Sequence, residues 1–175
     1  MRKQTEPLHL PEAAAPVAAA PIVWQWSAFA DLSVNELYAI LQARQRVFVV
    51  EQACPYLDAD GYDARAWHLL GWVEEDEARI LAAYARIFAP GVKYDEASIG
   101  RVMTHASMRG KGLGEALMGE ALRRLESLAP KAPVRIGAQM YLERFYEKAG
   151  FRRVSAPYDE DGILHIEMLR AADAL

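Results

Sequence analysis

A cluster of glycines in the second half of the chain constrains the fold more than any other feature. Three glycines stand at alternate positions directly before a helix predicted to begin near Leu113, in the run Arg109, Gly110, Lys111, Gly112, Leu113 and Gly114. Glycine lets consecutive backbone N–H groups turn toward one point, because no Cβ stands in the way. The first turn of the helix adds unpaired N–H groups and the positive end of its dipole. We therefore expect this loop to bind an anion such as a phosphate group.

Two commoner phosphate-binding motifs do not fit this run. The dinucleotide fingerprint G-x-G-x-x-G would need its third glycine where Glu115 stands. A Walker loop would need a glycine in place of His105, and a serine or threonine in place of Gly112. The pattern that remains is R-x-x-G-x-G, followed by an amphipathic helix.

A second signature follows this loop. Strands are predicted at residues 97–105 and 134–140, on either side of the loop and its helix. The second strand leads into a helix that ends in the run Phe145-Tyr146-Glu147-Lys148-Ala149-Gly150-Phe151, where Gly150 suits a left-handed helix end. The two signatures, in this order, resemble those of the GNAT superfamily of acyl-CoA-dependent N-acetyltransferases.

Further segments resemble the ElaA-like branch of this superfamily, and the resemblance covers roughly residues 22–170. The segments are residues 44–52, 54–56, Asp60 with Asp63, His68, 100–102, 138–139 and 158–168. The resemblance implies a single mixed α/β domain with a twisted, mostly antiparallel central sheet and helices on both faces. It does not identify the natural acceptor.

The same resemblance implies a reaction and a cosubstrate. Acetyl-CoA would bind with its pyrophosphate on residues 109–114 and its pantetheine arm beside Val102, Met103 and Thr104. The acetyl group would pass directly to a primary amine within a ternary complex. A backbone N–H on the strand that holds Met103 would meet the negative charge that develops on the carbonyl oxygen. No metal is implied.

Composition fits this interpretation and excludes other classes. The 175 residues suffice for one domain with a real core, and the net charge of -4 argues against binding nucleic acid through phosphate neutralisation. The single cysteine, Cys54, excludes an internal disulfide and a cysteine zinc cluster, which suits a reducing cytoplasm. No apolar stretch approaches the length of a membrane span. Nothing in the sequence predicts the oligomeric state.

The N-terminal segment differs from the rest in composition. Residues 1–21 contain four prolines and a run rich in alanine, so we interpret them as a disordered leader before a folded domain at residues 22–175. A signal peptide is the rival interpretation. It fits less well because Pro16 interrupts the weakly apolar run and Glu6 and Glu12 precede it.

The remaining elements follow from hydrophobic spacing. We expect strands at 22–29, 67–74, 78–89 and 163–169, a helix from Ser33 to about Val50, and a loop at 51–66. Ser33 and Glu36 form a capping box, and Asp76 stands in the expected hairpin turn. In the last strand, Leu164, Ile166 and Met168 should face the core. Gly119 interrupts the helix after the glycine loop, and either close packing or a nearby ligand would explain it.

Tyr146 is the candidate donor to the leaving thiolate, because it occupies the tyrosine position of the family's helix end. The ordinary pKa of a phenol lies within about two units of that of a free thiol, so proton transfer between them is feasible. The alternative is an aromatic side chain that only packs beside Phe145, with its hydroxyl at the surface.

The general base is less well defined by the sequence. Five residues qualify by type: Glu51, His68, Glu160, Asp161 and His165. His68 has the most suitable kind of side chain, but its apolar neighbours also suit a hydrogen-bonded structural histidine. Glu51 closes a helix, where a carboxylate opposes the dipole, although an arginine-paired or solvated glutamate explains it equally well.

Two features have plain structural interpretations beside their functional ones. The acidic run at residues 58–63 fails the test for a calcium loop, because its glycine comes too early and Leu69 replaces the bidentate glutamate. It is either a turn or an attraction for a cationic acceptor. Cys54 has no activating motif nearby, which favours an incidental thiol over an acyl-cysteine intermediate.

The sequence thus predicts an acetyl-CoA-dependent N-acetyltransferase. Two rivals remain. A non-catalytic acyl-CoA-binding or sensing module would keep the glycine loop but would not need Tyr146. An interaction domain tethered through residues 1–21 would lose its partner when the leader is deleted.

Overall fold

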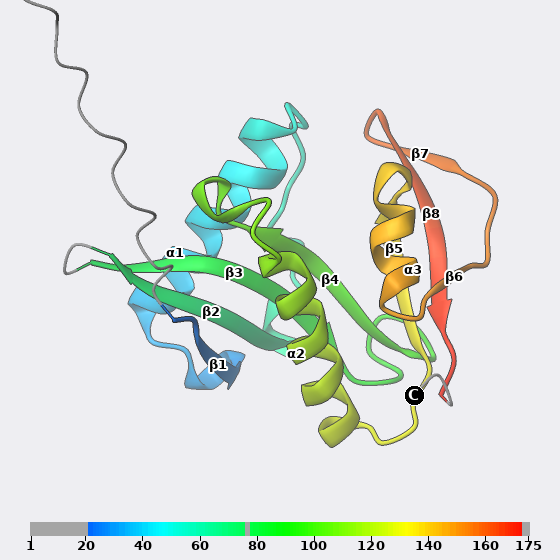
Figure 1. Ribbon diagram of the computed structural model, residues 1–175, viewed down its shortest axis with the longest axis horizontal. Coiled ribbons are helices and arrows are strands. Elements are labelled where there is room, and N and C mark those ends of the chain that lie inside the picture. The colour runs from blue at the N-terminus through cyan, green and yellow to red at the C-terminus, as the bar shows by residue number, and fades with distance from the viewer. Residues whose placement is uncertain (1–20, 76–77, 173–175) are drawn as a thin grey trace, which may run out of the picture.

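A single eight-stranded sheet organises the protein (Figure 1). The computed structural model describes residues 21–75 and 78–172, so the predicted leader, apart from Pro21, and the predicted turn residue Asp76 lie outside the described residues. The strand order is β1-β2-β3-β4-β5-β8-β6, and β7 pairs with β8. The strands are β1 (Val23–Ala28), β2 (Trp67–Glu75), β3 (Ala78–Phe88), β4 (Ala97–Thr104), β5 (Val134–Gln139), β6 (Arg152–Arg153), β7 (Tyr158–Glu160) and β8 (Ile163–Arg170).

Helices cover both faces of the sheet, as predicted. Helix α1 (Val34–Arg44) packs Ile40 against Leu70 on one face. Helix α2 (Leu113–Leu128) packs against the other face, in the same cluster as Leu69, and α3 (Glu143–Lys148) joins it there. Leu69 and Leu70 can serve opposite cores because successive side chains of a strand point to opposite faces. Every strand contact is antiparallel except that between β4 and β5.

The predicted first helix forms with the predicted start but changes its winding. The Ser33 hydroxyl accepts a hydrogen bond from the Glu36 N–H, and a Glu36 carboxylate oxygen accepts one from the Ser33 N–H at 2.8 Å, which completes the capping box. After Arg44 the chain continues as a π-helix, η2 (Gln45–Glu51). Such widened turns are frequent at functional sites, and this one leads into the loop that borders the cavity described below.

The middle of the sheet is split. The parallel pairing of β4 with β5 consists of Ala97 with Val134 and Ser98 with Arg135, and beyond these pairs the two strands separate (Figure 1). β4 has a bulge beside the split. Gly100 and Met103 are three residues apart in β4, whereas the residues that they pair with in β3 are two residues apart. Arg101, inside the bulge, has a φ of 51°. Bulges bend a strand and redirect its side chains.

One expectation for the last strand is wrong. Ile166 and Met168 are fully buried, but Leu164 is 48% exposed. The pairing of β8 with β5 ends at His165, opposite Gln139, so Leu164 lies beyond the edge of β5 and pairs only with Asp159 of β7. At this end of β8 the core therefore includes Ile166 but does not extend to Leu164.

Candidate active site

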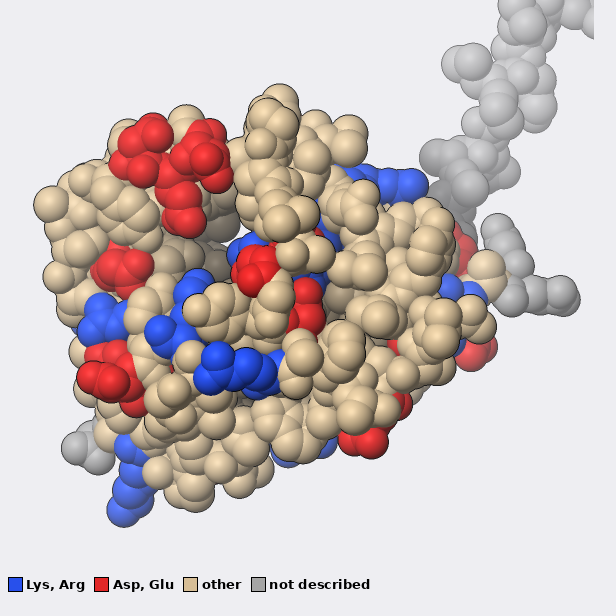
Figure 2. Space-filling model, turned by 180° about the vertical axis from the view of Figure 1, so that it is seen from behind, with Lys and Arg blue, Asp and Glu red and all other residues tan. Residues whose placement is uncertain are grey.

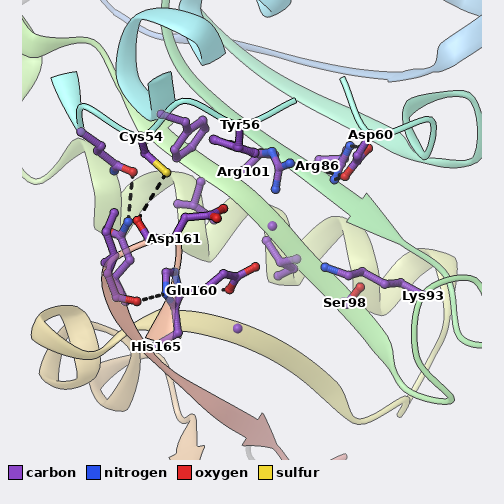
Figure 3. Close-up of a pocket in the computed structure, with 18 of the residues that line it drawn as sticks. Cys54, Tyr56, Asp60, Arg86, Lys93, Ser98, Arg101, Glu160, Asp161 and His165 are labelled. Carbon is purple, nitrogen blue, oxygen red and sulfur yellow. Dashed lines mark hydrogen bonds and ion pairs between the residues drawn. The ribbon is translucent and has the colours of Figure 1, made fainter. Parts of the chain in front are cut away.

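A cavity of about 440 Å³ opens where β4 and β5 separate (Figure 3). Its walls come from β3, β4 and β5, from the loop that follows η2, and from the β7–β8 hairpin. Tyr146 of α3 also lines it, although α3 packs on the opposite face of the sheet. The cavity therefore reaches through the split from the α1 face to the α3 face.

The glycine loop has the conformation that the sequence predicts. Gly110 and Gly112 have φ values of 74° and 78°, in the left-handed region that side chains disfavour. Gly112 caps α2, and among the described residues no side-chain hydrogen bond caps this helix. The first N–H groups of α2 are therefore available to bind an anion.

The edge of β4 that faces the split supplies further free backbone groups. Val102 lines the cavity, while Met103 pairs with Tyr84 of β3 and buries its side chain near α1. Thr104 ends the strand, and its carbonyl accepts a hydrogen bond from Arg109 Nε at 3.3 Å. Because β5 has already separated, no strand in the part of the chain that the structure describes pairs with this edge beyond Ser98. An extended ligand with amide groups can pair with it as a strand would.

Tyr146 is 7% exposed and packs edge-on against two aromatic rings, those of Phe145 and Phe151. Its hydroxyl forms no hydrogen bond within residues 21–75 and 78–172. Burial, with a smaller contribution from Tyr141, raises the pKa of Tyr146 to about 12. The phenol therefore stays protonated at neutral pH and can donate a hydrogen bond. The chain forms the aromatic helix end as predicted, with Gly150 at a φ of 89°.

Three of the five predicted base candidates lie together on the β7–β8 hairpin, at one end of the cavity. They are Glu160, Asp161 and His165. Figure 2 shows acidic side chains gathered beside a hollow, over this turn. The ring of His165 stacks on Tyr158, and its Nδ1 lies 2.8 Å from the Ile163 carbonyl. A carbonyl only accepts, so Nδ1 carries the proton in this contact, and Nε2, which forms no hydrogen bond with the described residues, is the acceptor of this tautomer.

Comparisons with known proteins agree with this geometry. The sequence profile of the acetyltransferase (GNAT) domain matches residues 65–171. The chain belongs to the GNAT family. It is 44% identical to the protein ElaA of Escherichia coli over 151 residues, which are 85% of this chain and 96% of ElaA.

Solved structures of other family members share the fold. An acyl-CoA N-acyltransferase from Pseudomonas aeruginosa superposes with a TM-score of 0.81 at 42% identity, covering 86% of this chain and all of that one. Crystalline E. coli ElaA gives 0.79 at 43% identity, covering 86% and 99%. The predicted mixed α/β GNAT fold and the ElaA-like branch are therefore confirmed, and with them a fold that uses acyl-CoA.

The acidic side chains of residues 58–63 form ion pairs with buried arginines. The sequence predicts either a turn or an attraction for a cationic acceptor, and neither interpretation includes these ion pairs. The network contains Arg44, Arg86, Arg101, Asp58, Asp60 and Asp63, joined by contacts of 2.6 to 3.4 Å. Arg44 is fully buried and Arg86 is 1% exposed. Burial opposes ionisation of Asp63, but bonds from Arg44 and Arg86 outweigh it and hold the pKa of this carboxyl below its ordinary value. Three positive charges thus meet three negative ones.

The two base candidates placed first by the sequence do not line this GNAT cavity. His68 is fully buried, with Nδ1 2.8 Å from the Tyr84 hydroxyl and Nε2 3.1 Å from the Asp63 carbonyl. Burial lowers its pKa, so the ring is neutral and holds two segments together. Glu51 pairs with Arg109 of the glycine loop, and not with the nearby Arg44 or Arg46. Both remain untested as bases.

Sequence reasoning missed several residues that line the cavity. Lys93 lies on the loop between β3 and β4, and Ser98 lies near the start of β4. The side chains of Gln52 and Gln139 bond to each other at 3.1 Å across the cavity wall. No motif marks these positions. Alternation along the strand predicted at 97–105 would have placed Ser98 and Gly100 on one face.

Cys54, also in the wall, fits its plain interpretation. Its thiol is buried and donates a weak hydrogen bond to the Asp161 carbonyl at 3.8 Å, and burial raises its pKa. A raised pKa disfavours the nucleophilic thiolate. Within the described ranges, no group of three or more His, Cys, Asp or Glu residues is arranged to hold a metal. The described helices include none long and apolar enough to cross a membrane.

Proposed function

We propose that this protein transfers the acetyl group of acetyl-CoA to a primary amine, by direct attack within a ternary complex. The observation that carries the proposal is the cavity that passes between β4 and β5. It joins the Tyr146 hydroxyl on one face of the sheet to the charged β7–β8 hairpin on the other. Donor and acceptor can therefore approach from opposite faces and meet in one cavity.

The donor would bind along surfaces that the fold leaves unpaired. Residues 109–114 and the first turn of α2 would hold the pyrophosphate, with Arg109 and Lys111 as added cations. The pantetheine arm would lie beside Val102, Met103 and Thr104, along the edge of β4 that pairs with no other strand in the described residues. This placement directs the thioester into the cavity, toward Tyr146.

The amine must lose a proton before it attacks. A lysine-like amine with a pKa of about 10.4 lies about 3.4 units from neutrality at pH 7, so deprotonation costs about 4 to 5 kcal/mol. Among the candidates in the cavity, His165 has the best geometry for a base, because the Ile163 carbonyl fixes its proton on Nδ1 and leaves Nε2 free. A Glu160 carboxylate oxygen lies 3.8 Å from Nδ1 and would stabilise the imidazolium that forms.

The amine nitrogen would then form a bond to the thioester carbon as the carbon–sulfur bond breaks. His165 has already taken the proton of the ammonium form, the second proton that the nitrogen loses on amide formation passes to solvent, and the sulfur leaves as a thiolate. Tyr146, with a pKa of about 12, is about 3.5 units less acidic than a free thiol. Full proton transfer from Tyr146 is therefore uphill, and its role would be to donate a hydrogen bond to the thiolate, which takes its proton from solvent as it leaves.

Release of free thiol from acetyl-CoA over a panel of amines tests this proposal. We expect amine-dependent release by the wild type, reduced in His165→Gln and in Tyr146→Phe, with the acetylated amine detected by mass. Binding of CoA without turnover of any amine would contradict the proposal. That result would favour the alternative, a module that only binds or senses acyl-CoA.

A further inference from the structure

One end of the cavity presents a positive charge without a partner. The ammonium group of Lys93 points into the cavity (Figure 3), and the side chain forms no hydrogen bond or ion pair with another residue in the described parts of the chain. The ammonium nitrogen lies 5.3 Å from the centre of the neighbouring Tyr94 ring. The other cations at this end, Arg86 and Arg101, are already neutralised by Asp58, Asp60 and Asp63. Lys93 therefore carries the free positive charge there.

A buried hydroxyl without a partner lines the same cavity. Ser98 is 2% exposed, and its Oγ forms no hydrogen bond with any residue that the structure describes. Arg86 and Phe88 of β3 lie opposite Gly100 and Ser98 of β4, so the Arg86 and Ser98 side chains share one face of the sheet. The Nε of Arg86 is also buried without a hydrogen bond. Such groups cost free energy unless a bound molecule or water satisfies them.

The opposite end of the cavity has the opposite character. There the β7–β8 hairpin contributes Glu160, Asp161 and His165. The cavity is thus bipolar, with free donors at the Lys93 end and free acceptors at the hairpin end. Burial and the charges of Arg101 and Arg86 lower the pKa of Lys93 by more than the carboxylates of Glu160 and Asp60 raise it, so a bound anion would relieve the remaining repulsion. An apolar acyl tail does not match these charged walls.

We propose that Lys93 and Ser98 bind a carboxylate of the acceptor, so that the acceptor is an amine that also carries a carboxylate, as amino acids do. The inference rests on the proposed function and names its substrate class. One ammonium and one hydroxyl match the two oxygens of a carboxylate, whereas a phosphate dianion would need more donors. With its carboxylate held at Lys93, the acceptor extends toward the hairpin, where His165 takes the proton of its amine. The cavity volume of about 440 Å³ suits a small molecule.

Matched acceptors and variants of the full chain test this inference. The acceptors are free amino acids, their carboxamides, and dipeptides with free C-termini. The variants are Lys93→Met, Ser98→Ala and the control Lys131→Met, which removes the same charge from an exposed position outside the cavity. Thiol release gives kcat and KM for each pair.

We expect the wild type and Lys131→Met to prefer the carboxylate over the carboxamide by about 10- to 100-fold in kcat/KM, mainly through KM. In Lys93→Met this ratio should fall toward one, and in Ser98→Ala it should fall part of the way. Dipeptides compared with free amino acids distinguish a peptide C-terminus from a free amino acid as the source of the carboxylate.

Two outcomes would overturn the inference, and they separate it from the proposed function. If carboxamides are acetylated as well as carboxylates, and Lys93→Met leaves the ratio unchanged, the inference is wrong while the transferase activity stands. If no amine is acetylated, calorimetric titration of an amino acid and of its amide into the CoA-bound wild type tests the carboxylate site directly. Equal binding of the two, or no binding of either, contradicts this site. Thermal melts identify a misfolded Lys93→Met, in which case Ser98→Ala gives the result.

Discussion

Arg109 Nη2 donates a hydrogen bond to the Glu51 carboxylate at 2.7 Å, which joins the end of η2 to the glycine loop. The same guanidinium bonds through Nε to the Thr104 carbonyl. Arg109 is thus fixed between β4 and the π-helical segment before any ligand arrives. The carboxylate of Glu51 would also repel the pyrophosphate that we propose for this loop.

Glu51→Gln should therefore change the binding of CoA and not the proton transfer. We expect CoA affinity to rise by about two- to fivefold at low salt, because a negative charge near the pyrophosphate is removed. The shape of the pH profile of kcat should stay the same. Calorimetric titration with CoA and steady-state kinetics check this. A large loss of kcat with a lost acidic limb would instead identify Glu51 as the base.

Tyr146→Phe should separate catalysis from stability. The hydroxyl has no hydrogen-bond partner in the described residues, so its removal should change the free energy of unfolding by less than about 1 kcal/mol. Loss of the donor to the developing thiolate should lower kcat by about 10- to 100-fold with little change in the affinity for CoA. Urea denaturation and thiol-release kinetics measure the two effects. Unchanged kcat would leave Tyr146 as a packing residue.

His68 should make the protein sensitive to mild acid. The buried ring has a lowered pKa, so between that value and the ordinary one of about 6.5 the unfolded chain binds a proton that the folded protein does not. Its contribution to stability is complete above pH about 6.5 and is lost as the pH falls through the folded value, with a slope of up to about 1.4 kcal/mol per pH unit.

Urea denaturation of the wild type and His68→Gln between pH 7.5 and pH 5 checks this expectation. The variant should be less stable at pH 7.5, because it loses the bridge from Tyr84 to Asp63, yet its stability should fall less steeply on acidification. Equal slopes in the two proteins would show that His68 is not the titrating group.

The arginine and aspartate network should be costly to break. Arg44→Met removes the fully buried cation that Asp58 and Asp63 share and leaves three carboxylates to two arginines, so we expect a loss of about 3 to 5 kcal/mol in the free energy of unfolding. Arg123→Met, which removes an exposed arginine paired with Glu120 on α2, is the matched control and should barely move the urea midpoint. Similar midpoints for both variants would contradict a structural role for the network.

Alanine substitution should change the stability of the protein in opposite directions at Gly112, which precedes α2, and at Gly119 within it. A Cβ at Gly119 would meet nothing within 4 Å, which excludes close packing as the reason for this glycine. Gly119→Ala should stabilise the protein by about 0.5 to 1 kcal/mol. Gly112→Ala should destabilise it by about 1 to 2 kcal/mol, because its φ of 78° disfavours any side chain. Thermal melts compare them, and a destabilised Gly119→Ala would point to a contact made in solution.

Local signals were sufficient for most of the fold. The capping box of Ser33, the glycines before α2 and the helix end at Gly150 all act within one turn, and each forms as predicted. The face of Leu164 was wrong because the length of the neighbouring strand, not the alternation of β8, decides where the core ends.

The site was harder to predict because its contacts are distant in sequence. Arg44 reaches Asp58 and Asp63, and Arg86 reaches Asp60, across strands and loops that no spacing rule relates. Residue type alone also places arginine at the surface, whereas Arg44 and Arg86 are buried. The bulge at Arg101, which turns this side chain toward Asp58, leaves no mark in the sequence.

The split between β4 and β5 has a consequence for the unliganded protein. Within the described residues, the paired part of β4 and β5 consists of Ala97 with Val134 and Ser98 with Arg135. A bound donor whose amides pair with the free edge of β4 would act as a temporary strand. The gap between β4 and β5 would then be filled only while the donor is bound, and it would open again each time the product leaves.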